Sequence, residues 1–323
     1  MMTHLLIPLL LLSAGLLLLT FGAEGLVEGS LRLSRRLGLS PLVAGLTIVA
    51  FGTSCPELGV SLSAAIKGVP DIAIGNVVGS NIANAFLIVG IGAIIRPFRC
   101  HPSLVRIEVP FLFVMTSLAW GLALLGPLHI TYGLMAVGAF SLYCMYLYRA
   151  RANPAYSIGG DERSSGGKRH RKYIHLFYEL ALAVGGLLAL VYGSKVFLIG
   201  AIKIGAILGV PDLFIGLTIT AVGTSLPEIA ATVSAARRGS GDVIMGNVIG
   251  SNLANLCLVL GITSLIKPVR VAHLALVRDF PMLMVSSLML LVLVVRGGKI
   301  GRWFGLLLIS IYSGYVFYIY GLI

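Results

Sequence analysis

Charged residues are scarce in this chain: Asp, Glu, Lys and Arg together make up only 11% of its 323 residues. A soluble globular domain carries about a quarter. Hydrophobic residues make up 58% of the chain, and the mean hydropathy is +0.99. No soluble domain of this length needs so much apolar surface, so the composition predicts an integral membrane protein in contact with the lipid bilayer.

Cysteine and histidine are also few. The four cysteines, Cys55, Cys100, Cys144 and Cys257, show neither paired spacing nor the spacing of a metal site. A disulfide framework is therefore not indicated, and we interpret them as small apolar residues. The six histidines all fall near the ends of predicted helices or in loops, which argues against a zinc or copper centre.

Apolar windows of about 20 residues, the length that spans a bilayer core, occur ten times and predict an all-α fold. They lie at 5–28, 40–66, 71–95, 104–125, 128–149, 174–201, 211–236, 243–266, 273–295 and 301–322. No basic segment precedes the first window as it does in a cleavable signal peptide, so we expect 5–28 to be a retained helix.

The net charge of +12 does not indicate nucleic-acid binding, because the basic residues follow the membrane topology. If the N-terminus lies outside, the inside connections hold 18 of the 24 Lys and Arg residues. Cytoplasmic connections carry such an excess. We therefore predict an inner-membrane protein with both termini outside and a basic cytoplasmic linker at 149–173, which joins two five-helix repeats at 1–148 and 174–323.

The two halves contain copies of one segment. Residues 45–98 and 216–269 are identical at 28 of 54 positions, without a gap, at an offset of 171. Each copy contains GTSxPE followed by GNVxGSNxAN. Because five helices is an odd number, the second copy enters the membrane upside down, which predicts an inverted-topology repeat. A proline within helix 2 and another within helix 7 predict that these helices are broken.

Each copy places a glutamate, Glu57 or Glu228, directly after that proline in an apolar run. An ionisable group at bilayer depth is costly and is by default a functional-site candidate. Helical spacing puts Thr47, Ala50, Thr53 and Ser54 on the same face as Glu57, and the second copy repeats the pattern. The next helix of each copy adds asparagines and a serine at every fourth position: Asn76, Ser80 and Asn84, or Asn247, Ser251 and Asn255.

All these groups offer oxygen: carboxylate, hydroxyl, amide or backbone carbonyl. Oxygen sets favour hard cations, and Ca²⁺ accepts six to eight such ligands in flexible geometry. Taken singly, the Asn, Ser, Gly and Pro residues are also what helix packing would use. The glutamates have no comparable structural explanation, and their duplication favours a binding site on the symmetry axis of the repeat.

The paired motifs resemble the α-repeats of the Ca²⁺/cation antiporter superfamily, most closely its prokaryotic Na⁺/Ca²⁺ exchanger branch. The resemblance covers essentially the whole chain and implies ten helices with alternating access. It implies the following ion ligands, with Ala50 and Ala221 contributing backbone carbonyls: Ala50, Thr53, Ser54, Glu57, Ser80, Asn84, Ala221, Thr224, Ser225, Glu228, Ser251 and Asn255. Exchangers of this branch often have an aspartate where Asn255 stands, so this site keeps two carboxylates.

The predicted function is an antiporter that moves Ca²⁺ in exchange for Na⁺ and needs no cofactor and no obligatory protein partner. An alternative within transporters is Ca²⁺/H⁺ exchange, with the glutamates protonated instead. An intramembrane enzyme could use paired glutamates as acid and base, but no Arg, Lys or His on these faces would recognise a substrate. A cation channel would conduct without an obligatory counter-ion.

Overall fold

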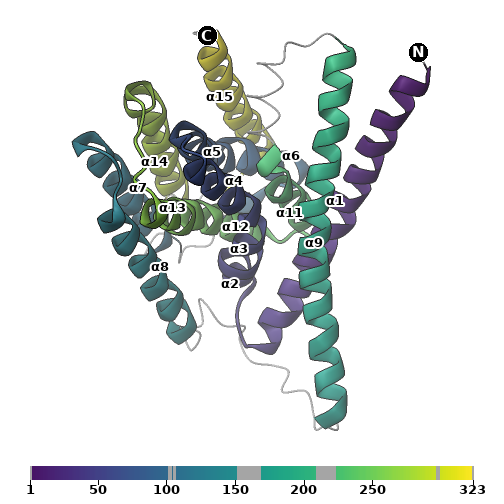
Figure 1. Ribbon diagram of the computed structural model, residues 1–323. Coiled ribbons are helices and arrows are strands. Elements are labelled where there is room, and N and C mark those ends of the chain that lie inside the picture. The colour runs from purple at the N-terminus through teal and green to yellow at the C-terminus, as the bar shows by residue number, and fades with distance from the viewer. Residues whose placement is uncertain are drawn as a thin grey trace.

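Helices form nearly all of the described chain in the computed structural model (Figure 1). The structure describes residues 2–100, 104, 107–150, 169–208, 223–295 and 299–321. Eight described helices are long and apolar enough to cross a membrane, and a pair bent by 42° adds a ninth span. Of the tenth predicted span, 211–236, the structure describes residues 223–236. An all-helical membrane fold is therefore confirmed.

The first half begins with α1 (Met2–Arg36). A broken helix follows, made of α2 (Pro41–Ala44), the π-helical turn η1 (Gly45–Val49), α3 (Ala50–Thr53) and α4 (Cys55–Ile66). The next helix runs without a break through α5 (Pro70–Ala83), the π-helical turn η2 (Asn84–Ile88) and α6 (Val89–Ile95). The half ends with the short strand β1 (Phe98–Arg99) and helices α7 (Glu108–Leu125) and α8 (Ile130–Ala150).

The second half repeats this order. It contains α9 (Arg169–Ile207), α11 (Leu226–Arg237), and a helix made of α12 (Gly241–Ala254), η4 (Asn255–Val259) and α13 (Leu260–Ile266). Then come η5 (Ala275–Asp279), α14 (Phe280–Val295), β2 (Lys299–Ile300) and α15 (Arg302–Gly321). Most of the predicted linker 149–173 lies outside the described residues. Its two ends, 149–150 and 169–173, belong to helices α8 and α9.

The break in the second span lies at Ser54, between α3 and α4. Pro56 occupies the first turn of α4, where its missing N–H costs nothing. The second repeat begins α11 in the same way, with Pro227 after Ser225. The Gly223 carbonyl, which lies ahead of this break, accepts a hydrogen bond of 2.6 Å from the Ser194 hydroxyl. The second span is therefore broken where the sequence predicts it, and in the second repeat α11 begins at the equivalent proline.

Helices α1 and α9 are equivalent at the 171-residue offset, and they lie side by side on one flank of the molecule (Figure 1). They run antiparallel, because Gly15 lies against Phe197 whereas Gly29 lies against Ala183. Other contacts between the repeats also come in equivalent pairs. Strand β1 pairs with β2, and the residues equivalent to these strands at the same offset, Val269 and Leu128, form a bridge. Equivalent elements of the two repeats thus exchange equivalent contacts.

Candidate functional site

The two glutamates lie in the first turns of α4 and α11. Both side chains are buried, with 0% of Glu57 and 1% of Glu228 exposed. The positive end of a helix dipole favours a negative charge there. The hydroxyls of Ser80 and Thr224 lie near Glu57, and those of Thr53 and Ser54 lie near Glu228, but none of them makes a hydrogen bond of normal geometry to a carboxylate oxygen. The bundle thus brings both carboxylates and hydroxyls of both repeats into one buried site.

This site contains a group of buried oxygen atoms that have no hydrogen-bond partner among the described residues. They are both carboxylate oxygens of Glu57, both of Glu228, Ser54 Oγ, Asn84 Oδ1 and Asn255 Oδ1. Buried polar atoms are nearly always paired, and a cluster of exceptions points to an ion or water that satisfies them. All the atoms here are oxygens, and all but the Ser54 hydroxyl can only accept, which suits a hard cation.

Hydrogen bonds across the repeats hold the hydroxyl ligands in place. Thr53 Oγ1 donates to Asn247 Oδ1 at 3.3 Å, and the equivalent Thr224 Oγ1 donates to Asn76 Oδ1 at 3.2 Å. Asn76 also donates to the backbone carbonyl of Glu57 at 3.0 Å. These asparagines therefore fasten the broken helix of one repeat to the α5 or α12 helix of the other.

Every other predicted ligand in the described chain is also buried. The Ala50 carbonyl accepts from Ser251 Oγ at 3.5 Å, and it lies 3.3 Å from Thr53 Oγ1, whose single proton can go either to this carbonyl or to Asn247 Oδ1. Ser225 Oγ donates to Ser80 Oγ at 3.3 Å. Ala221 lies outside the described residues. Eleven of the twelve predicted residues are therefore described and buried: Ala50, Thr53, Ser54, Glu57, Ser80, Asn84, Thr224, Ser225, Glu228, Ser251 and Asn255.

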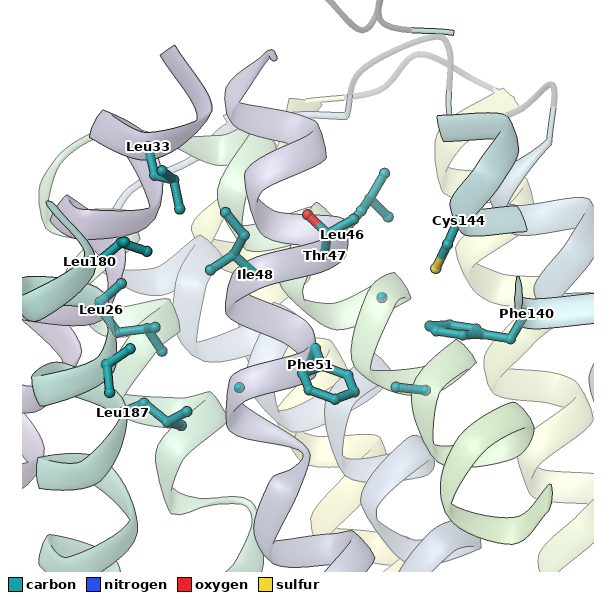
Figure 2. Close-up of a pocket in the computed structure, with 15 residues that line it drawn as sticks. Leu26, Leu33, Leu46, Thr47, Ile48, Phe51, Phe140, Cys144, Leu180 and Leu187 are labelled. Carbon is teal, nitrogen blue, oxygen red and sulfur yellow. The ribbon is translucent and has the colours of Figure 1, made fainter. Parts of the chain in front are cut away.

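The prediction for Thr47 is wrong. Its hydroxyl donates to the Val43 carbonyl at 2.6 Å, and its side chain lines a separate cavity of about 480 Å³. The π-helical turn η1 changes the helical register between Thr47 and Ala50. Figure 2 shows this cavity between leucines of α1 and α9 on one flank and Phe140 and Cys144 of α8 on the other. Its walls are almost entirely apolar, so it does not suit an ion.

A second cavity, of about 650 Å³, lies between α4 and α9. Cys55, Pro56 and Thr224 line it at the level of the site, and Lys67 and Val69 line it at the far end of α4. Lys195 of α9 also borders it. The cavity runs along α4 from the break at Cys55 to the end of the helix at Lys67, and both glutamates remain buried.

The equivalent helices of the other repeat, α11 and α1, are in direct contact. Helix α1 packs along α11, and Glu28 of α1 forms an ion pair with Arg238 at the end of α11. Arg32 also pairs with Glu28, at 2.6 Å. The two flanks thus differ: a cavity lies between α4 and α9, whereas α11 and α1 pack together and are joined by the Glu28–Arg238 pair.

The sequence and fold match known proteins over nearly their whole length. The family profile described as sodium/calcium exchanger protein matches residues 7–150 and 178–321. The chain belongs to the sodium/calcium exchanger family. It is 34% identical to the sodium/calcium exchanger MaX1 of Methanosarcina acetivorans, covering 95% of this chain and 97% of that one. It is also 34% identical to the inner membrane protein YrbG of Escherichia coli, over 92% of each.

Solved structures of the sodium-calcium exchanger NCX_Mj have the same fold. One, soaked with 10 mM Na⁺ and no Ca²⁺, superposes with a TM-score of 0.81 at 31% identity and covers 97% of this chain and 98% of that one. Another was soaked with Na⁺ and Sr²⁺ and gives a TM-score of 0.80. This protein is therefore an integral membrane antiporter of cations, as the sequence predicts.

Two buried residues next to the predicted ligands were not predicted. Asn81 and Asn252 follow the ligand serines directly, in the GSN of each motif, and each donates its side-chain amide to the other's backbone. Their only signal in the sequence is their presence in both copies of the repeat. Helical spacing places them off the Ser80–Asn84 face, so periodicity alone assigns them to packing.

Proposed function

We propose that this protein exports Ca²⁺ in exchange for Na⁺ by alternating access at the site between Glu57 and Glu228. The observation that carries the proposal is the cluster of buried oxygens without partners. In this proposal the ion is cargo, bound by two carboxylates together with hydroxyls, amides and the carbonyls of Ala50 and Ala221.

Charge balance explains why such a site would exchange ions. Two ionised glutamates carry a charge of −2, which one Ca²⁺ or two or more Na⁺ can neutralise. An empty site leaves two charges uncompensated inside the bundle, at about 2.5–3.5 kcal/mol each on the insertion scale. Crossing with an ion bound is therefore favoured over crossing empty. If more positive charge enters as Na⁺ than leaves as Ca²⁺, the membrane potential adds about 2.3 kcal/mol per net charge per 100 mV.

We also propose that the ten spans form an inverted repeat with both termini outside and 149–173 in the cytoplasm. The antiparallel packing of α1 and α9 supports the inversion. Lys and Arg residues cluster in the connections that this orientation places inside, which supports the orientation. The cavity between α4 and α9 then opens outward, and the Glu28–Arg238 pair closes the inner path.

The decisive test measures Ca²⁺ uptake by inside-out vesicles that contain the purified protein. Vesicles loaded with Na⁺ should accumulate Ca²⁺ when the external solution lacks Na⁺, and an imposed pH gradient alone should drive little uptake. Uptake driven by the pH gradient and not by Na⁺ would establish the Ca²⁺/H⁺ alternative. Rapid Ca²⁺ efflux without either counter-ion would indicate a channel.

Replacing Glu28 with glutamine should remove the ion pair that joins α1 to the end of α11 and should favour the inward-open conformation. A partly exposed ion pair contributes at most about 1 kcal/mol, so the inward-open population should rise about two- to five-fold. A cysteine at Leu226, the counterpart of Cys55 in the second repeat, should report this change. In a protein whose native cysteines are replaced by alanine, Leu226→Cys should react faster with an impermeant thiol reagent applied to inside-out vesicles.

Arg32→Gln provides the matched control for Glu28→Gln, because it removes a partner of Glu28 but leaves the Glu28–Arg238 pair intact. Its effect on labelling should be the smaller of the two. Equal labelling rates in the parent and in Glu28→Gln would show that this ion pair does not close the inner path.

A further inference from the structure

Asn81 and Asn252 meet at the centre of the bundle, where α5 of one repeat faces α12 of the other. Both side chains are fully buried. Asn81 Nδ2 donates to the Asn252 backbone carbonyl at 3.3 Å, and Asn252 Nδ2 donates to the Asn81 backbone carbonyl, also at 3.3 Å. The two residues are 171 positions apart, so this reciprocal pair lies on the axis that relates the repeats.

The backbone carbonyls fix which way these two amides point. A carbonyl can only accept a hydrogen bond, so the Nδ2 of each asparagine must face it and the Oδ1 must face elsewhere. Each Oδ1 accepts a bond from a neighbouring asparagine: Asn255 Nδ2 donates to Asn81 Oδ1 at 3.0 Å, and Asn84 Nδ2 donates to Asn252 Oδ1 at 2.9 Å. Asn255 and Asn84 must therefore turn their Nδ2 atoms toward these Oδ1 acceptors.

The consequence falls on Asn84 and Asn255. With their nitrogens bound to the central pair, their Oδ1 atoms must point the opposite way, and these are two of the buried oxygens without a partner. An amide turned over would present an NH₂ group to a cation, which repels it instead of coordinating it. Two chains of hydrogen bonds, each running from a backbone carbonyl through two asparagines, thus fix the orientation of the Asn84 and Asn255 amides.

We propose that Asn81 and Asn252 are positioning residues that hold the Asn255 and Asn84 amides with oxygen toward the transported ion. This proposal rests on the proposed function, because it assumes a cation at the Glu57–Glu228 site. It also explains a requirement specific to asparagine ligands. A carboxylate has two equivalent oxygens and no nitrogen, so an aspartate at position 84 or 255 needs no such orientation.

The test uses that difference in a crossed set of variants. Asn81→Leu keeps the shape of the side chain but removes its hydrogen bonds, and it should raise the KM for Ca²⁺ about ten-fold or more with a smaller change in kcat. This is the range seen when a partner that orients a metal ligand is lost. In an Asn255→Asp background the same substitution should change KM by no more than about two-fold, whereas in an Asn84→Asp background the full effect should remain.

Asn252→Leu should show the opposite pattern: rescue by Asn84→Asp and no rescue by Asn255→Asp. A purely structural role in helix packing would not distinguish between the two aspartate backgrounds. Equal KM shifts in both backgrounds, or no shift in Asn81→Leu, would overturn the proposal. If a leucine variant does not fold, Asn81→Ala and Asn252→Ala replace it in the same comparisons.

The parent protein is assayed in parallel for Na⁺-driven Ca²⁺ uptake. A parent that transports no Ca²⁺ would refute the proposed function. A parent that transports normally while the crossed rescue fails would refute only the positioning role of Asn81 and Asn252. The thermal stabilisation of each purified variant by Ca²⁺ gives a second readout of binding that does not depend on transport.

Discussion

Glu57→Gln and Glu228→Gln should each abolish Ca²⁺ transport, with a loss of about two orders of magnitude or more. Glutamine preserves the shape of the side chain and removes one of the two charges that balance a divalent ion. The Ca²⁺ would then carry an uncompensated charge in a buried site, and removing one partner of a buried charge pair costs about 3–5 kcal/mol. Both side chains are buried, so solvent cannot replace the missing charge.

The same substitutions should make the ion-free protein more stable. The carboxylate oxygens have no hydrogen-bond partner in the part of the chain that the structure describes, so a neutral amide removes an unfavourable buried charge. We therefore expect each variant to unfold at a higher temperature than the parent in chelator, and to lose the stabilisation that Ca²⁺ gives the parent. Loss of transport through misfolding would instead lower the unfolding temperature.

Asp71→Asn is the matched control for both glutamine variants, because it makes the same change of carboxylate to amide at the exposed start of α5. Its Ca²⁺ transport and its Ca²⁺-dependent stabilisation should both remain close to those of the parent. Transport at a near-normal rate by folded Glu57→Gln or Glu228→Gln would show that the ion does not bind between the glutamates.

The position of the candidate site could be proposed from the sequence because the repeat gives two matching motifs, where a single motif would be ambiguous. One buried glutamate after a proline is ambiguous, but two at a fixed offset require a shared explanation. Helix boundaries were less predictable. Helices α1 and α9 extend well beyond their predicted spans, 5–28 and 174–201. Nothing in hydrophobic length tells a helix to stop at the membrane surface, and Arg36 stabilises the extension by pairing with Glu179 at 2.6 Å.

Two features of the site depend on tertiary contacts that no periodicity encodes. The roles of Asn81 and Asn252 depend on which backbone carbonyl each amide meets in the other repeat. The ion pair between α1 and the end of α11 depends on Glu28, whose counterpart in the second repeat is Ile199. The repeat predicts equivalent helices on both flanks, but Arg238 at the end of α11 has Glu28 as its partner, whereas its counterpart Lys67 at the end of α4 has Ile199 in the equivalent position.

The second large effect is expected at Gly186, where α1 and α9 come closest. A Cβ atom there would lie 2.3 Å from the backbone nitrogen of Leu26 and 2.7 Å from the Gly22 carbonyl oxygen. Both atoms belong to a rigid helix backbone, so the helices must move apart. Gly186→Ala should therefore destabilise the protein by about 1–3 kcal/mol, the usual cost of overpacking, and Gly186→Leu should prevent stable folding. Thermal unfolding in detergent and transport in vesicles measure the two effects.

The neighbouring Gly185 provides a matched control for Gly186, because a Cβ atom added there meets nothing within 4 Å. Alanine favours a helix over glycine by about 1 kcal/mol, so Gly185→Ala should leave stability unchanged or raise it. Two identical substitutions at adjacent positions are thus expected to have opposite signs. Lipid gives helices no hydrophobic reason to associate, and close backbone packing supplies the attraction instead. If Gly185→Ala and Gly186→Ala unfold at the same temperature, α1 and α9 are not held together by this close approach.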